Sequence, residues 1–134
     1  MNHISNDKMN AMFKSVIDMD RNSVVICDTG HKIVYMNPAA VKNYSKSGGK
    51  ALLGSSVLDC HNERSREIIL KVFEWFSQDI RNNMIYTGHS ASKNKDIYMV
   101  ALRDSDGELI GYYEKHEFRN PETAGLYDYS LSLV

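Results

Sequence analysis

The sequence has 134 residues, 43% hydrophobic and 25% charged, which suits one globular domain with a single hydrophobic core. Its 16 Lys and Arg nearly cancel its 17 Asp and Glu, leaving a net charge of -1, so charge gives no reason to expect nucleic-acid or anionic-membrane binding. No apolar run approaches the roughly 20 residues of a membrane-spanning helix, and residues 1–20 are too polar for a secretory signal. We therefore expect a cytoplasmic protein.

Residues 1–20 are expected to form an amphipathic helix that stands apart from the main domain. Ser5, Asn6 and Asp7 are suitable N-cap residues. Apolar side chains then recur at the i, i+3, i+4, i+7, i+8 spacing of one helix face, at Met9, Met12, Phe13, Val16 and Ile17.

A hairpin and a short helix are predicted next. Extended runs at Val24–Cys27 and Lys32–Met36 flank residues 28–31, whose Asp and Gly suit a tight turn with positive φ. Asn37-Pro38 can begin a helix that continues to Tyr44. The glycine pair in Ser45–Lys50 indicates a loop.

The second half of the chain predicts one long helix and an antiparallel meander. Residues 62–80 place Ile69, Val72, Phe73, Phe76 and Ile80 on one helix face. The expected strands are Met84–His89, Asp96–Arg103 and Glu108–Phe118. Residues 21–119 would form the domain, and residues 120–134 a short helix or loose tail. The fold class is α+β, with a five-stranded antiparallel sheet, short helices and one long helix on one face.

Three turn motifs in this order resemble the PAS family of sensor domains. They are Val25-x-x-Asp28-x-Gly30-x-x-Ile33-x-x-x-Asn37-Pro38-Ala39, Leu53-Gly54 and Arg103-Asp104-x-Asp106-Gly107-x-x-x-Gly111. The resemblance covers residues 23–118 and implies a sensory or regulatory module of bacterial signal transduction that binds a small molecule.

A more specific resemblance is carried by Leu58-Asp59-Cys60-His61-Asn62-Glu63-Arg64-Ser65. It is similar to a bacterial PAS subgroup, often attached to hemerythrin-like domains, with a Cys-His-Pro-Pro-Lys-Ser motif before the long helix. In this sequence Asn62 and Glu63 replace the prolines and Arg64 replaces the lysine.

PAS domains hold ligands between the sheet and the long helix, and the resemblance implies which side chains face that space. Aligned on Asn37 and Gly111, the ligand-binding residues would be Val25, Cys27, Val34, Met36, Cys60, His61, Ile69, Phe73, Met99, Ala101 and Tyr113. A solid core is the alternative, because apolar periodicity usually means packing. Flexible methionines with polar groups such as His61 and Tyr113 favour a pocket for a small, largely apolar molecule with a polar or acidic group.

The Cys60-His61 pair leaves two interpretations open. Imidazole and thiolate bind metals and haem iron, so a haem-based redox or gas sensor that uses His61 is the alternative function. The other interpretation is that His61 organises the start of the long helix. The ligating His of haem-binding PAS domains usually lies within the long helix, and none lies between Asn62 and Ile80.

Other cofactors and catalytic sites are not indicated. A flavin photosensor of the PAS type needs a Cys three residues after the mid-domain glycine, and that residue is Val57. The spacing of the two cysteines and five histidines gives no zinc motif, so we expect free thiols and no bound metal. Neither G-x-S-x-G nor a phosphate-binding loop is present. A Cys60-His61 nucleophile and base would lack a third group, and the prediction is a protein without enzyme activity.

The last feature is the apolar second face of the predicted sheet. Alternate residues Tyr98, Val100, Leu102, Ile110 and Tyr112 would face away from the pocket. Such a face needs a cover, and the N-terminal helix could provide it from the same chain or from a partner. We expect a homodimer formed through this helix and the outer sheet face.

Overall fold

A computed structural model describes residues 3–133. Its helices are α1 (Asn6–Asp18), α2 (Pro38–Asn43) and α3 (Glu63–Gln78), and three short 3-10 turns, η1 (Ser45–Ser47), η2 (Gly49–Leu52) and η3 (Val57–Cys60), lie between α2 and α3. The strands are β1 (Val25–Asp28), β2 (Ile33–Met36), β3 (Met84–Ser90), β4 (Lys95–Arg103) and β5 (Leu109–Phe118). Each predicted helix and strand is present, with ends shifted by a residue or two, except that α1 begins at Asn6 within the predicted range 1–20.

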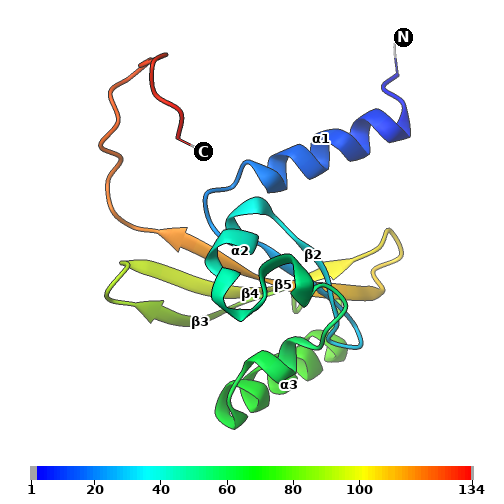
Figure 1. Cartoon of the computed structure of the whole chain (residues 1–134). Coiled ribbons are helices and arrows are strands. Elements are labelled where there is room, and N and C mark those ends of the chain that lie inside the picture. Colours follow the sequence, from blue (N-terminus) through cyan, green and yellow to red (C-terminus); the bar gives the residue numbers. More distant parts are fainter. Residues whose placement is uncertain (1–2, 134) are drawn as a thin grey trace.

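The strands form one five-stranded sheet in the order β2-β1-β5-β4-β3, and every neighbouring pair is antiparallel. Figure 1 shows α3 lying along one side of this sheet, with α2 and the 3-10 turns crossing in front of it. The buried core joins the sheet to both helices through Cys27 and Tyr112 on the strands, Ala40 on α2 and Phe76 on α3. The predicted α+β fold class is therefore confirmed.

Asparagine side chains begin two of the helices. The Asn37 Oδ1 atom accepts hydrogen bonds from the backbone N–H groups of Val24 and Ala40, both at 2.9 Å. The Asn37 amide group donates to backbone carbonyls of residues 17, 20 and 22. Asn62 caps α3 by accepting from the N–H of Ser65 at 2.9 Å. Asn37 thus joins the segment after α1 to the β2–α2 corner, whereas Asn62 serves one helix end.

Aspartates organise both predicted hairpin turns. Asp28 Oδ1 accepts from the N–H groups of Gly30 and Lys32, and Asp104 Oδ1 accepts from those of Asp106 and Glu108. In the first turn the positive φ falls on His31, at 65°, rather than on Gly30. Arg103, which precedes the second turn, links this turn to α3. Its guanidinium donates a hydrogen bond to the carbonyl of Phe76, near the end of α3, at 2.6 Å.

Two bulges change which side chains face the core, and they correct the expected alternation. Between β1 and β2, Ile26 pairs with Tyr35 but Cys27 pairs with Ile33, so Val34 is the extra residue. Val34 is 53% exposed, and Ile33, only 3% exposed, takes the inward position. A bulge adds one residue to one strand and reverses the facing of the residues beyond it.

The second bulge lies between β4 and β5. Leu102 pairs with Gly111 and Arg103 with Leu109, which leaves Ile110 unpaired and 54% exposed. Tyr112, predicted for the outer face, is therefore buried at 3% exposure. Its neighbour Tyr113, predicted for the pocket, points to the other side of the sheet.

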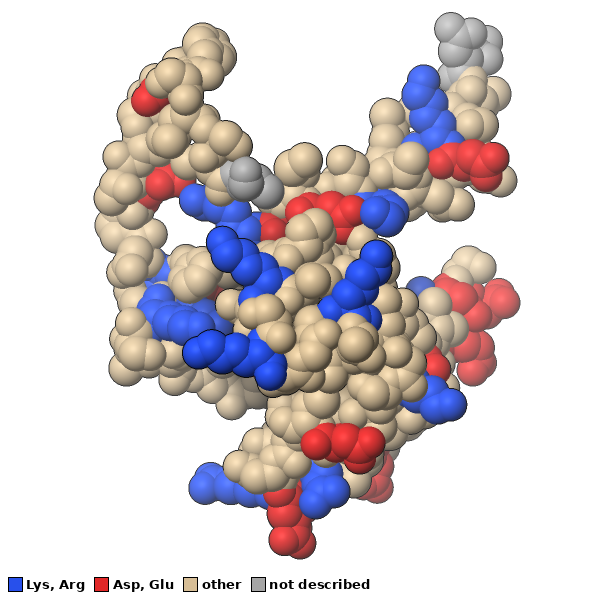
Figure 2. Space-filling view, in the orientation of Figure 1, with Lys and Arg blue, Asp and Glu red and all other residues tan. Residues whose placement is uncertain are grey.

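Helix α1 does not bury its apolar stripe within this chain. No residue of α1 is buried, and Phe13 and Val16 are 60% and 73% exposed. Figure 2 shows α1 and the C-terminal segment rising from the body on opposite sides, with open space between them. The prediction that α1 covers the outer sheet face of the same chain is thus wrong, and a covering partner stays a prediction.

Residues 120–133 contain turns but no helix. Across residues 3–133, no helix has the length and apolar character needed to cross a membrane.

Candidate functional site

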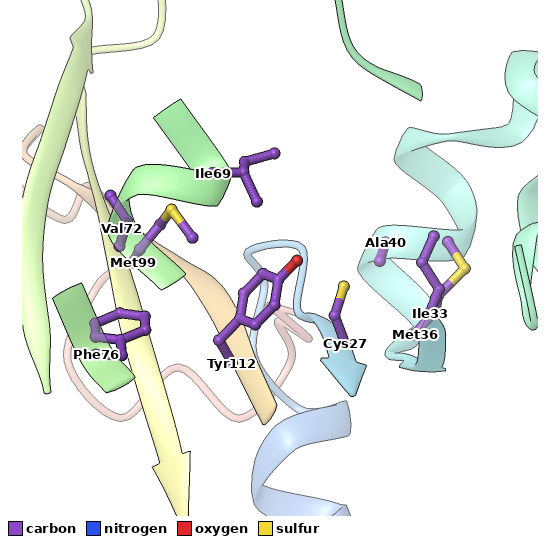
Figure 3. Packing of buried hydrophobic residues seen from close by; sticks show 9 residues of the cluster. All are labelled: Cys27, Ile33, Met36, Ala40, Ile69, Val72, Phe76, Met99 and Tyr112. Carbon is purple, nitrogen blue, oxygen red and sulfur yellow. The ribbon is translucent and has the colours of Figure 1, made fainter. Parts of the chain in front are cut away.

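A cavity of about 150 Å³ lies between the sheet, α3 and the segment that carries η1 to η3. Figure 3 shows the Tyr112 ring and the Cys27 thiol projecting between two groups of apolar side chains, with Ile69 and Met99 on one side and Ile33 and Met36 on the other. All six of these side chains line the cavity. The space between α3 and the sheet therefore contains a cavity and is not a solid core.

Most of the residues predicted from the sequence lie at this cavity. Its lining includes Val25, Cys27, Met36, Cys60, His61, Ile69 and Met99. Their role in binding a ligand stays a prediction. His61 is the residue that follows η3, immediately before the Asn62 cap of α3, so a cavity position and a place at the helix start are compatible.

The other four predicted residues do not line the cavity. Val34 and Tyr113 are displaced by the two bulges described above. Phe73 lies behind the cavity wall, with its ring centroid 5.9 Å from that of Tyr112 and 4.9 Å from that of His31. Ala101 pairs with Tyr112 across the strands and packs against the core.

Two groups in the apolar part of the wall are held in their neutral forms. Burial raises the pKa of the Cys27 thiol to about 11, so this thiol stays protonated near neutral pH and is a poor metal ligand or nucleophile. Burial also raises the pKa of Tyr112. The Tyr112 hydroxyl lies 2.8 Å from Nδ1 of His31, which links the cavity wall to the β1–β2 turn.

Sequence reasoning missed the polar residues that β5 contributes to the cavity, Glu114 and His116. They are opposite Met99 and Ile97 of β4, and they share the inward face with Tyr112. The Glu-x-His spacing is visible in the sequence, but only the bulge at Ile110 turns it toward the cavity. Without that bulge the same pattern indicates a solvated strand face.

The environment of Glu114 and His116 is strongly perturbed. Burial raises the pKa of the Glu114 carboxyl. Glu114 lines the cavity, and 45% of its side-chain surface is accessible. His116 is nine-tenths buried, with 10% of its side chain accessible. Its pKa is lowered to about 4, mainly by burial and then by Lys95 and Lys93, so its imidazole is neutral near pH 7.

Metal coordination is not suggested by the side chains that the structure places. Within residues 3–133, no three His, Cys, Asp or Glu side chains converge in the way that a metal ion requires. Cys27 and Cys60 are both free thiols. The cavity thus offers an apolar wall, the imidazoles of His61 and His116, four hydroxyl groups from Ser23, Tyr44, Ser47 and Tyr112, and one carboxyl.

Comparisons with known proteins support the fold. No protein-family model matches the sequence, and a search of curated proteins finds no relative. Among solved structures, a C-terminal domain from Streptococcus mutans is similar with a TM-score of 0.62 and 16% identity, over 87% of this chain and 90% of that one.

Two of the similar structures are PAS domains. The PAS domain of a Colwellia psychrerythraea protein gives a TM-score of 0.60 at 13% identity, over 83% of this chain and 97% of that one. The PAS domain of Bordetella pertussis BvgS gives 0.55 at 17% identity, over 87% and 89%. The chain therefore has the fold of PAS domains. The subgroup with the Cys-His-Pro-Pro-Lys-Ser motif and its link to hemerythrin-like domains stay predictions.

Proposed function

We propose that this chain is a sensory or regulatory module that binds one small, largely apolar molecule in the cavity beside Tyr112. The observation that carries this proposal is the cavity itself, because a well-packed core of this size rarely leaves such a volume inside. An apolar cavity of about 150 Å³ in another protein accommodates benzene. A ligand with one ring, or a short chain of similar bulk, therefore matches the space.

The same volume favours an organic ligand over the haem alternative. A porphyrin is several times larger than a benzene ring, so binding through His61 would require α3 and the 3-10 turns to move apart. The raised pKa of Cys27 also removes a thiolate ligand from the apolar wall. We infer binding rather than catalysis, since Cys27 is unreactive and no base is placed against Cys60 in the described part of the chain.

A pair of Val→Phe variants tests the cavity. Val57 lines it, whereas Val72 is a core residue of α3, 8% exposed, that does not. A phenyl ring at position 57 can enter the cavity and displace the ligand, with little change in the urea midpoint. The same change at position 72 has no space to enter and should destabilise the fold by about 1–3 kcal/mol.

The measurements are native mass spectrometry for co-purified ligand, NMR titration with benzyl alcohol, and urea unfolding. We expect the parent to bind and Val57→Phe to remain folded without binding. Equal destabilisation of both variants, with no ligand and no titration in the parent, would show that the interior is solid and would overturn the proposal.

We further propose that signals pass through a homodimer formed by α1 and the outer sheet face. The exposed Phe13 and Val16 support this proposal, because a soluble helix normally buries its apolar stripe. Light scattering should show a dimer for the parent and for Ser15→Glu, but a monomer for a Phe13→Glu, Val16→Glu double variant. Point variants are preferable to deleting α1, because Asn37 binds the carbonyl of Ile17. A monomeric parent at high concentration would refute the dimer.

A further inference from the structure

One end of the cavity carries an acceptor that nothing in the chain satisfies. His116 is nine-tenths buried, it lines the cavity, and its Nδ1 atom has no hydrogen-bond partner. A buried polar atom without a partner destabilises the fold, because it has lost its hydrogen bonds to water. Within residues 3–133 the only other orphaned buried side-chain atom is Asn22 Oδ1. Nδ1 of His116 has almost no accessible surface, so a partner from outside the chain reaches it only when the imidazole turns toward the cavity.

The geometry around His116 fixes what that partner must offer. Its Nε2 atom lies 3.5 Å from Oε1 of Glu114, and a carboxylate on that side favours the tautomer with the proton on Nε2. Nδ1 of a neutral His116 is then a lone-pair acceptor. The missing partner must therefore be a donor, either N–H or O–H.

Glu114 also requires a hydrogen-bond donor, and because it is a carboxylate it favours a cationic one. Among residues 3–133, its carboxyl has no ion pair with Lys or Arg, and its single close charged contact is the long one to His116. Lys95 reaches Glu114 only through its longer-range field, because its amino group sits over the Phe118 ring, 6.0 Å from the centroid. A carboxylate in a poorly solvated cavity is stabilised by a cationic donor.

The remaining ionisable groups near this end do not replace that cation. They are His61 and Cys60 from the segment before α3, Tyr44 after α2, Lys93 near the start of β4, Asp20 after α1 and Cys27 of β1. His61 could supply a positive charge only when protonated, and its contribution to Glu114 is electrostatic. An anionic ligand would meet the Glu114 carboxylate and an imidazole acceptor, which is unfavourable.

We propose that Glu114 and His116 form a head-group site for a protonated nitrogen, so that the cavity selects a small organic amine or a similar N–H cation with an apolar body. This proposal rests on the cavity being a ligand site. It replaces the acidic or neutral polar group expected from the sequence with a basic one. The ammonium group would donate to the Glu114 carboxylate and, with the imidazole turned toward the cavity, to Nδ1 of His116, and the apolar body would lie against Met99 and Ile69.

Three probes of nearly equal bulk test the choice of head group. Benzylamine, benzyl alcohol and benzoate share one ring and carry a cation, a neutral donor and an anion at pH 7. In NMR or calorimetric titrations of the full chain, we expect benzylamine to bind about tenfold tighter than benzyl alcohol, as a charge-assisted hydrogen bond predicts. Benzoate should bind most weakly.

Two matched variants assign the selectivity to the proposed residues. Glu114→Gln keeps the shape but removes the charge, and it should reduce the preference for benzylamine to within about threefold. Glu117→Gln makes the same change at a residue of β5 that pairs with Lys115 and Arg119 outside the cavity lining, and it should leave the preference intact. His116→Leu should weaken benzylamine and benzyl alcohol together, because it removes the shared acceptor.

Unfolding experiments without ligand test the environment of Glu114 in the folded state. Burial raises the pKa of Glu114 in the folded state, so the native state loses stability as pH rises and the carboxyl ionises. Glu114→Gln should remove that loss and leave the urea midpoint at pH 7 equal to or above that of the parent.

The outcomes separate this inference from the proposed function. Equal binding of all three probes, abolished by Val57→Phe, would refute the head-group site while keeping the ligand cavity. A preference for benzylamine that survives Glu114→Gln would also refute it. If none of the probes binds and no ligand co-purifies, the proposed function itself is wrong.

Discussion

Asn37 offers the sharpest test of how the fold joins α1 to the core of the domain. It is fully buried, and its Oδ1 atom accepts hydrogen bonds from the N–H groups of Val24 and Ala40. Replacing Asn37 with Ala leaves both buried donors unsatisfied, at about 1–2 kcal/mol each. The carbonyls that its amide group serves can be resolvated more easily, because they are partly buried. The expected loss is about 2–4 kcal/mol in the free energy of unfolding.

Asn62→Ala is the matched control. Asn62 has the same role as an N-cap of α3, but it is exposed and serves one backbone N–H, that of Ser65. Its loss should cost about 1 kcal/mol. Urea unfolding of both variants gives the comparison, with unchanged m-values as evidence of two-state behaviour. Equal losses at the two sites would refute the reasoning, since only burial and the number of partners distinguish them.

The remaining predictions concern the sheet. Gly111→Ala should destabilise the chain by about 1–3 kcal/mol in urea unfolding, because a Cβ there would collide with a backbone carbonyl of β1. Gly88→Ala is the control, because a Cβ at Gly88 meets open space and should change stability little. Similar losses of stability in the two variants would contradict this prediction. Hydrogen bonds from Arg119 and His89 hold the pKa of Asp96 at about 2, below its usual 3.8. This contribution to stability is therefore present above pH 4 and is lost as pH falls toward 2. In the Asp96→Asn variant, the urea midpoint should change less between pH 4 and pH 2 than it does in the parent. An equal change with pH in both proteins would contradict this prediction.

The elements could be predicted from the sequence because their signals are local. Helix periodicity, the Asn-Pro start of α2 and the Asp-Gly turns each act within a few residues, and all appear in the structure. The facing of strand residues was predictable only as far as strict alternation held. The predicted facing of Val34 was wrong because Val34 is the extra residue of the first bulge, and that of Tyr113 because it follows the second bulge at Ile110.

The sequence carries no clear signal of the two bulges, because the residues that compete for each inward position are chemically alike. Ile33 and Val34 suit a core position equally well, and so do Tyr112 and Tyr113. The choice between them depends on which arrangement packs best against Phe76 and Ile69 of α3. That packing energy arises between distant segments, so one sequence read locally cannot rank the two registers.

The same register choice decides the chemistry of the cavity. With the bulge at Ile110, β5 turns Glu114 and His116 inward and places Lys115 and Glu117 outside, where they form an ion pair at 2.7 Å. Without it, the inward residues would be the lysine and a different glutamate. A fold selected for stability alone gains little from a carboxyl without a cationic partner beside a buried imidazole with an unpartnered nitrogen, because burying such groups even in part is costly. The proposed amine would offset that cost, and the titrations with benzylamine measure that stabilisation directly.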